Sequence, residues 1–535
     1  MIFRMQDAST ALGTSAWTFL ERSTDKVAKA LDRWKYMLLL VCTACYAFIS
    51  CYQANRKLFW FDELFTVHVS RLPSLRLIWD ALINGADFNP PLLYVFTHFS
   101  EAIAGPGPVG ARLPAIVGFW IFCLCLFRFV SIRSSALAGF ISMGFPLITT
   151  VYLYAFEARS YGLVLGFCGL GLISWQALTT TQKGRFWLAL ALFASLSGAL
   201  LTHGYAFLLF VPFVAGELVR TIFRRRVDWI VWTALITASS AMLAFIPILR
   251  SLRALLGVGE VLVATATKLA HSYDSLLGPA ATFTMFVLGM ICMDFLARRS
   301  AADHDVAPKK QGTQQRGFQP HEKVAVVAFL TIPVFSYLAA RLSGAPMMDR
   351  YSLATVAGVA VLLGVAAAKR AITGLLVLSV LSALLARQFL NFAGGVAMKE
   401  PAGGLMISTV QGIFNQRYYF MSSGEDDKLP IVLLDTWEWA TTFFYAPPEV
   451  ASRLIYLGEQ DPINAKAYAH LHDCCGAPSK VANLDEIRAT TGTFLIYVSS
   501  ASYWKISRFA ETGGTVSVRK IAPDFALLQV TYPSR

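Results

Sequence analysis

The sequence predicts a mainly helical polytopic membrane protein, with a bundle of about eleven transmembrane helices and a soluble C-terminal α/β domain. Three observations predict this fold class. Of the 535 residues, 56% are hydrophobic and only 15% are charged, which is unlike the composition of soluble domains. Apolar stretches of about 20 residues, the length that crosses a bilayer, recur along most of the chain. Basic residues cluster in short runs between these stretches, as the positive-inside rule requires.

The polar and basic residues 1–35 form an N-terminal segment that we place in the cytoplasm. The apolar run Tyr36–Tyr52 follows without a small-residue cleavage site, so we expect an uncleaved membrane anchor. The transmembrane domain that begins there is predicted to cover residues 36–392, with a first external loop at 55–112. Within that loop, Leu92–Ile103 is apolar but too short to span a membrane, which predicts an interfacial helix.

Further apolar stretches of near membrane length follow the anchor and bring the expected total to about eleven. Alternate gaps between the spans should then be cytoplasmic, and every basic cluster falls in one of those gaps. The longest such gap is a flexible cytoplasmic linker at residues 298–322. The stretches are 113–130, 136–155, 160–179, 186–202, 205–222, 229–248, 281–297, 323–340, 351–368 and 371–391.

Hydropathy falls after Leu390, and residues 393–535 are predicted to form an external domain of ordinary size. Short apolar runs rich in β-branched residues predict strands, and a helix-like stretch, Trp437–Tyr445, follows the first of them. An α/β sandwich is the expected architecture. The predicted strands are Ile431–Asp435, Leu454–Leu457, Thr493–Val498 and Phe525–Thr531.

The net charge of +13 does not indicate a nucleic-acid partner, because the basic residues are distributed among the gaps between spans. Most of the cysteines lie in apolar spans, where a thiol packs as a small hydrophobic group, so they do not indicate a redox compartment. The stretch from His470 to Cys475 is rich in histidine and cysteine, but its spacing fits no common zinc site. A vicinal disulfide or an exposed loop is the favoured interpretation there.

An adjacent pair of carboxylates, Asp62 and Glu63, lies in the aromatic stretch that follows the first span. Ionised groups so close to a membrane surface are costly to desolvate, so they either face water or serve a function. Neighbouring side chains point roughly 100° apart on a helix, so this pair does not flank one bond as the carboxylates of a glycosidase do. At most one of them touches a reacting atom. The alternative interpretation is an interfacial loop whose acids are merely solvated.

Several short motifs occur in a characteristic order. Asp-Glu opens the first external loop, Pro-Pro-Leu-Leu-Tyr follows at 90–94, Ala-Arg-Leu-Pro-Ala at 111–115 and Glu-Ala-Arg-Ser-Tyr at 157–161. Over residues 36–370 this order resembles the GT-C superfamily of integral-membrane glycosyltransferases. Within that superfamily, the chain resembles the aminoarabinose transferases of lipid A, the protein O-mannosyltransferases and the bacterial lipopolysaccharide galacturonosyltransferases.

The resemblance implies a GT-C-type bundle and a polyprenyl-phosphate sugar donor. It implies inverting transfer, without a nucleotide sugar, to an external acceptor. The acceptor would be lipid A or lipopolysaccharide, another cell-envelope glycan, or a protein. The C-terminal domain would bind the acceptor. The expected location is the bacterial inner membrane, with the active site and the C-terminal domain on the periplasmic side.

The resemblance assigns the role of catalytic base to Asp62 and makes Glu63 a supporting or acceptor-orienting group. One base suffices, because the phosphate departs with its negative charge already stabilised. The leaving phosphate needs fixed positive charge, for which Arg159 and Arg350 are candidates, since both are external and lie next to or near a tyrosine. Asn89 stands where aminoarabinose transferases carry a phosphate-binding lysine, so it supplies a hydrogen bond but no charge.

The remaining site candidates are Tyr351, Glu157, Tyr161, His203 and Arg112. Tyr351 adjoins Arg350 and joins the phosphate-binding candidates. Arg112 is expected to anchor the topology or to pair with the loop acids, and His203 to pack at the membrane interface. No metal ligand is identified and no cofactor is expected to be required, whereas a dependence on a divalent metal is left open.

A secondary transporter or a flippase for lipid-linked glycans is the main alternative function, since it would share the length, span count and polarity. Such proteins place ionisable residues near the bilayer midplane, whereas the span centres here are almost free of charge. A glycan polymerase or ligase of the same superfamily is the second alternative. Its large soluble part would be a late external loop, whereas the soluble part of this chain is terminal.

Overall fold

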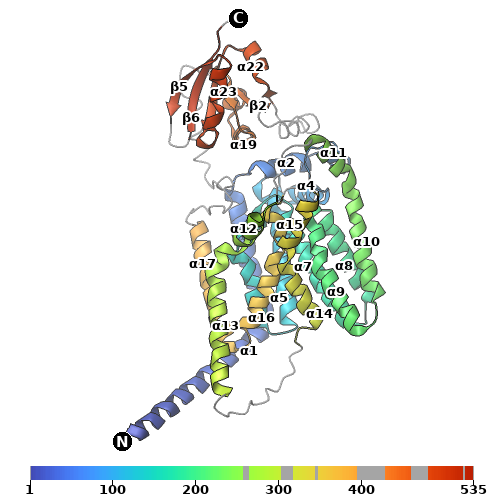
Figure 1. Ribbon diagram of the computed structural model, residues 1–535, viewed down its shortest axis with the longest axis vertical. Coiled ribbons are helices and arrows are strands. Elements are labelled where there is room, and N and C mark those ends of the chain that lie inside the picture. Colours follow the sequence, from blue (N-terminus) through green and yellow to red (C-terminus); the bar gives the residue numbers. More distant parts are fainter. Residues whose placement is uncertain are drawn as a thin grey trace. The chain divides into compact units, whose positions relative to one another are not determined.

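The computed structural model describes residues 2–256, 264–302, 317–343, 347–393, 428–458, 480–521 and 525–533. The chain forms two compact units (Figure 1). The helical unit comprises Met1–Tyr52, Pro114–Ala244 and Glu260–Val396, and the mixed unit comprises Gln53–Leu113, Phe245–Gly259 and Ala397–Arg535. The stretch from His470 to Cys475 and most of the 298–322 linker lie outside the described residues.

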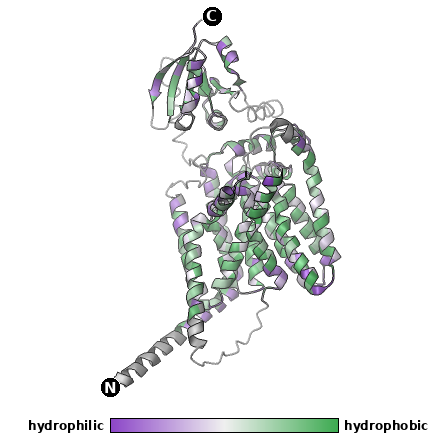
Figure 2. Cartoon of the chain, in the orientation of Figure 1, coloured by the Kyte–Doolittle hydropathy of each residue, from purple (hydrophilic) through white to green (hydrophobic). Residues whose placement is uncertain are grey.

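Apolar residues, green in Figure 2, cover most of the helices of the helical unit. Its α-helices are α1 (Ile2–Arg56), α5 (Pro108–Ser131), α6 (Ala136–Gly144), α7 (Tyr161–Thr180), α8 (Arg185–Leu200), α9 (Phe210–Arg224), α10 (Trp229–Ser239), α12 (Ala266–Leu277), α13 (Ala281–Ala302), α14 (Pro320–Leu330), α15 (Ile332–Ser343), α16 (Thr355–Ala367) and α17 (Ala371–Ala393). Short 3₁₀ helices join them: η1 (Phe145–Ile148), η2 (Thr150–Phe156), η3 (Gly204–Leu209), η4 (Ser240–Phe245), η5 (Gly278–Ala280) and η6 (Asp349–Ser352). Helices α1 and α5 each continue into the mixed unit.

Among the described residues, 7 helices are long and apolar enough to cross a membrane, or 9 if each of two bent pairs is one span. The bent pairs are α6–η1 with η2, at 78°, and α14 with α15, at 55°. The expected spans 186–202 and 351–368 are the shorter helices α8 and α16, of 16 and 13 residues. Their lengths, about 24 and 20 Å, fall short of the roughly 30 Å hydrocarbon core. The chain is an integral membrane protein, but the count of eleven spans is not confirmed.

One connection is more helical than the sequence predicts. The stretch expected as a loop, Arg250–Pro279, contains the end of α11 (Ile246–Leu256) and the whole of α12. The apolar candidate span there covers Ala266–Asp294, and so begins before the expected 281–297. The prediction missed α12 because Lys268, His271 and Asp274 interrupt its apolar residues.

Glycines bring α7 close to α5. A Cβ atom on Gly118 of α5 would lie 2.5 Å from the carbonyl oxygen of Gly162 in α7, and a Cβ on Gly166 would lie 2.7 Å from the carbonyl oxygen of Gly118. Backbones at this separation leave no room for a side chain, as is usual where membrane helices cross at small residues. The crossing fixes the first turn of α7, where Tyr161 lies.

The mixed unit contains three short helices of the first external loop and the C-terminal domain. The loop helices are α2 (Phe61–Ser70), α3 (Leu75–Ile83) and α4 (Leu92–Ala104), so the expected interfacial stretch is helical. The domain contains β1 (Ile431–Leu433), α19 (Thr436–Tyr445), α20 (Pro448–Ala451), β2 (Leu454–Leu457), β3 (Val481–Ala482), α22 (Leu484–Thr490), β4 (Thr493–Ser499), η8 (Ser500–Lys505), α23 (Ser507–Glu511), β5 (Thr515–Ile521) and β6 (Phe525–Thr531).

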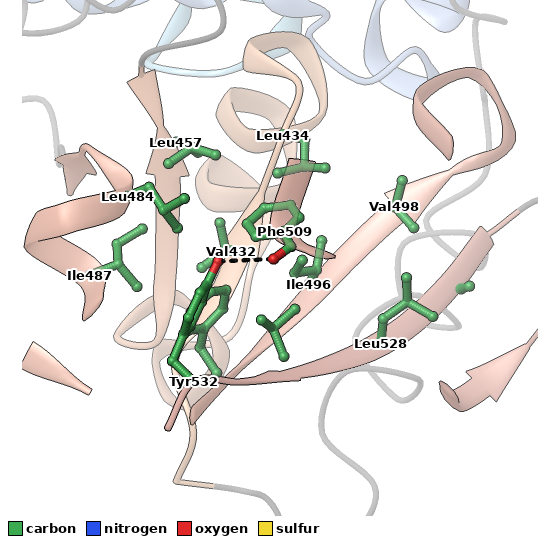
Figure 3. Close-up of a cluster of buried hydrophobic side chains, with 13 residues drawn as sticks. Val432, Leu434, Leu457, Leu484, Ile487, Ile496, Val498, Phe509, Leu528 and Tyr532 are labelled. Carbon is green, nitrogen blue, oxygen red and sulfur yellow. Dashed lines mark hydrogen bonds between the residues drawn. The ribbon is translucent and has the colours of Figure 1, made fainter. Parts of the chain in front are cut away.

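The strands form one sheet in the order β3-β2-β1-β4-β6-β5. The first four strands of this order are parallel, and β6 pairs antiparallel with both β4 and β5. Side chains alternate between the faces of a strand. One face, shown in Figure 3, packs Val432 and Ile496 against Ile487 of α22 and Phe509 of α23. On the other face, Trp439 of α19 lies 5.6 Å from Tyr456, measured between ring centres. Helices therefore cover both faces, which confirms the predicted α/β architecture.

Candidate active site

The acid pair lies at the start of α2, just after the end of α1. Trp60 is the N-cap residue of α2, and its backbone N–H donates a hydrogen bond to Glu63 Oε2 at 3.2 Å. Asp62 and Glu63 occupy the first turn, where the helix dipole stabilises negative charge. Glu63 is fully buried, whereas Asp62 is partly exposed. Since they are neighbours on a helix, the two side chains point in different directions.

Arg112 of α5 is also fully buried and binds both carboxylate oxygens of Glu63. Its Nε donates to Oε1 and its Nη2 to Oε2, both at 2.7 Å. The guanidinium also donates to the carbonyl oxygens of Ala54 at 2.5 Å, Lys57 at 2.6 Å and Leu58 at 3.0 Å. Such a fork satisfies a buried carboxylate better than a lysine does. Arg112 thereby fastens the end of α1 to the start of α2.

Helix α2 is also joined to α4. Arg71 Nη2 donates to Glu101 Oε1 at 2.8 Å, and His98 Nδ1 donates to the carbonyl oxygen of Ser70 at 2.8 Å. Asn89 is buried in the turn that precedes α4. The Arg71–Glu101 pair was not predictable from the sequence, because its members lie 30 residues apart and no periodic pattern connects them.

A second group of candidates lies in the helical unit. We call it the arginine cluster, and it consists of Arg159, Tyr161, His203, Tyr205, Arg350 and Tyr351. The Arg350 guanidinium lies 5.9 Å from the ring centre of Tyr161. The ring centre of His203 lies 5.5 Å from that of Tyr161 and 5.2 Å from that of Tyr351. Arg159 is buried just before α7, as is Glu157. All cluster members except Arg159 line one small pocket that is partly open to solvent.

The pKa of His203 reflects the burial and the positive charge of the arginine cluster. Burial and the positive charges of Arg159 and Arg350 lower the pKa of His203 to about 3. His203 Nδ1 accepts the N–H of Tyr205 at 3.1 Å, so the neutral ring carries its proton on Nε2. Arg159 and Arg350 place two positive charges next to this neutral ring, so the cluster is suited to an anion.

Tyr205 belongs to the cluster although the sequence did not single it out. Its ring stacks on that of Tyr351 with centres 4.0 Å apart. The available signal was its position two residues after His203, at the external start of the expected span 205–222, but this position does not show where the ring points. The other residues that the sequence singled out divide between the units. The mixed unit holds Asp62, Glu63, Asn89 and Arg112, and the helical unit holds Glu157, Arg159, Tyr161, His203, Arg350 and Tyr351. In the part of the chain that the structure describes, no His, Cys, Asp and Glu side chains form a group able to hold a metal.

Two crystal structures of ArnT, an aminoarabinose transferase, from Cupriavidus metallidurans share the fold of this chain. The apo structure aligns with a TM-score of 0.56 and 13% identity over 93% of this chain and 97% of that one. The structure bound to undecaprenyl phosphate aligns with a TM-score of 0.55 and 13% identity over 93% of this chain and 98% of that one. In sequence, no family model and no curated protein matches the chain.

Proposed function

We propose that this chain, which has the GT-C-type fold of ArnT, is a membrane glycosyltransferase with a polyprenyl-phosphate sugar donor. The observation that carries the proposal is the arginine cluster. A departing phosphate requires fixed positive charge and hydrogen-bond donors where negative charge develops. Arg159 and Arg350 supply the charge, and His203 Nε2 supplies a neutral donor. The complex of ArnT with undecaprenyl phosphate supports a polyprenyl phosphate as the lipid part of the donor.

In the proposed reaction, a hydroxyl oxygen of the acceptor attacks the anomeric carbon of the donor sugar. The bond between that carbon and the phosphate oxygen breaks, and polyprenyl phosphate leaves with the bonding electrons. Asp62 takes the hydroxyl proton as general base. Of the two acids, Asp62 is suited to this role because it is partly exposed, whereas both oxygens of Glu63 are bound by Arg112. Displacement in one step inverts the configuration of the sugar.

Other candidate residues have supporting roles in the proposal. Glu63 and Arg112 hold the start of α2 and so orient Asp62. Asn89 donates a hydrogen bond to the donor phosphate, in the place where a lysine would contribute charge. Tyr161 and Tyr351 help to hold Arg350, whose guanidinium lies 5.9 Å from the ring centre of Tyr161. Glu157, two residues before Arg159, belongs to the same buried segment.

The acceptor is proposed to lie outside the membrane and to be lipid A or lipopolysaccharide, another envelope glycan, or a protein. The placement of basic clusters in alternate gaps supports an inner-membrane protein whose first external loop, which carries Asp62 and Glu63, faces the periplasm together with the C-terminal domain. An external site of this kind would draw its sugar from a lipid carrier, since nucleotide sugars are made in the cytoplasm.

The experiment that tests the function uses the full chain purified in detergent. Lipids that co-purify with the chain are identified by mass spectrometry, and the sugar lipid found is then supplied to the protein with a total envelope extract as acceptor. We expect release of polyprenyl phosphate by the parent chain and little release by Asp62→Asn. A transporter or flippase would leave the bond between sugar and phosphate intact in both proteins, and that outcome would refute the proposal.

A further inference from the structure

The C-terminal domain reaches the segment that carries Asp62 through the end of α19, and both belong to the mixed unit. Trp439 is almost fully buried and packs on Tyr456 of β2, which anchors α19 to the sheet. The start of α19 follows β1, and Phe444 and Tyr445 form the other end of the helix. Helices α19 and α2 contact each other and lie next to one another in Figure 1.

The contact is made by one hydrogen bond and two ring pairs. The hydroxyl oxygen of Tyr445 accepts the N–H of Phe59 at 2.6 Å, across 386 residues of sequence. The Phe444 ring meets the Phe59 ring edge to face, with centres 6.1 Å apart. It also meets the ring of His68 on α2, with centres 5.9 Å apart. The end of α19 therefore holds both the entry to α2 and one side of that helix.

Phe59 makes several of the contacts that hold the segment leading to Asp62. Tyr445 holds its amide, and the Arg112 guanidinium lies 4.7 Å from the centre of its ring. The next residue, Trp60, caps α2 and donates its N–H to Glu63. Asp62 follows within the first turn. Because the residues around a helix cap fix how the chain enters the helix, the Tyr445 hydroxyl helps to determine where the Asp62 carboxylate lies.

We propose that α19 is part of the active site and that Tyr445 is a positioning residue for Asp62, an inference that rests on the proposed role of Asp62 as base. Burial raises the pKa of Tyr445 to about 12, so its hydroxyl remains neutral at physiological pH. The C-terminal domain thus contributes to the transfer step itself. Its removal or displacement would disturb catalysis even when the donor phosphate still binds.

The first test measures the contact directly in the full-length protein. Tyr445→Phe keeps the ring and removes the acceptor for the Phe59 amide, and Tyr503→Phe, at an exposed tyrosine of the same domain, is the matched control. Hydrogen exchange of a peptide spanning residues 58–65 is expected to become roughly tenfold faster in Tyr445→Phe, the effect of losing one buried hydrogen bond. Exchange in β4 and throughout Tyr503→Phe should match the parent. Unchanged exchange at 58–65 would overturn the proposal.

The second test separates positioning from general stability. With the assay described for the proposed function, Tyr445→Phe is expected to lower kcat by roughly tenfold while the KM for the sugar lipid stays the same. In the Asp62→Asn background, Tyr445→Phe should cause no further loss, because it acts through the missing carboxylate. Additive losses would show that Tyr445 acts independently of Asp62 and would overturn the inference. Full activity of Asp62→Asn alone would instead refute the proposed base, whereas the exchange experiment would still decide whether α19 holds the loop.

Discussion

Arg112 and Glu63 form a bidentate ion pair from which solvent is excluded. Each side chain has 0% exposure, and Nε–Oε1 and Nη2–Oε2 are both 2.7 Å apart. Burial of a charged pair is costly unless the remaining hydrogen-bonding groups also find partners. Here the carbonyl oxygens of Ala54, Lys57 and Leu58 accept from the guanidinium. The pair therefore belongs to the architecture that presents Asp62.

Arg112→Lys should destabilise the folded chain. A lysine cannot reproduce the fork, so the Glu63 carboxylate and several carbonyl oxygens would lose partners inside the protein. Breaking a buried pair typically costs about 3–5 kcal/mol, and a lysine that keeps part of the contact should cost somewhat less. The measurement is the midpoint of thermal unfolding in detergent. Arg76→Lys is the control, because Arg76 is 91% exposed and its contact with Asp80 is 3.9 Å long. Equal midpoints for the two variants would contradict the prediction.

Asp62→Asn should preserve the fold and abolish most of the transfer activity. The side chains are nearly isosteric, but an amide cannot take the proton of the acceptor. Loss of a positioned general base usually lowers turnover by roughly 10²–10⁴-fold. Turnover of the purified variant with the sugar lipid checks this, with Asp80→Asn on α3 as the matched control. Near-parental turnover of Asp62→Asn would remove Asp62 from the mechanism.

Much of the architecture was predictable because it follows from local patterns. The length of apolar runs located most membrane helices, and β-branched runs located four strands of the C-terminal sheet. The bends within the two bent helix pairs were not predicted. Pro146 lies in the first pair and Pro333 in the second, and a proline interrupts a helix because it lacks a backbone N–H. The length of α16 was overestimated because Tyr351 and Ser352, predicted to begin the span 351–368, belong to the 3₁₀ helix η6.

The candidate site was predictable only in part, for a related reason. Charge, an external position in the chain and the family resemblance indicated Asp62, Arg159 and Arg350. The contact of Tyr445 with Phe59 was not predictable, because its partners lie 386 residues apart and neither stands out locally. Long-range hydrogen bonds of this kind depend on how whole elements pack, which periodicity does not encode.

The topology can be tested at the two connections that the charge distribution assigns to opposite sides. A reporter fused at Gln311 should report the cytoplasm, and one fused at Gly424 should report the external side, because basic clusters favour cytoplasmic gaps. Alkaline phosphatase and green fluorescent protein fusions provide complementary readouts. If both positions report the same side, the number of crossings between them is not odd, and the eleven-span arrangement is wrong.

Acid should destabilise the protein before its carboxylates titrate. Burial and nearby arginines lower the pKa of His68 to about 4 and that of His203 to about 3, from an ordinary value of 6.5. As pH falls below 6.5, the unfolded chain binds protons that the folded protein does not, so the stability from these groups is lost. Each histidine contributes a slope of up to roughly 1.4 kcal/mol per pH unit.

Between pH 6.5 and 5, His203→Gln should therefore flatten the decline of the unfolding midpoint. His271→Gln is the control, because the His271 side chain is 51% exposed. A decline of the same steepness in His203→Gln and in the parent would show that His203 does not remain neutral in the folded protein.

The last prediction concerns the donor phosphate, for which Asn89 offers no charge. Arg159→Ala and Arg350→Ala should each weaken binding of undecaprenyl phosphate by about 1.5–3 kcal/mol, the usual contribution of a charge-assisted hydrogen bond. Arg159→Lys should also be impaired, because one ammonium group cannot replace the bidentate fork. Asn89→Lys should tighten binding if Asn89 contacts the phosphate, since it adds a charge.

The measurement is the dissociation constant of undecaprenyl phosphate for all four variants in one detergent preparation. Arg341→Ala is the matched control, because Arg341 is an exposed arginine of the same unit. Its affinity should equal that of the parent. If both alanine variants in the arginine cluster also bind as the parent does, the phosphate site lies elsewhere. Arg112 would not replace them, since its guanidinium is already committed to Glu63 and to the carbonyl oxygens around it.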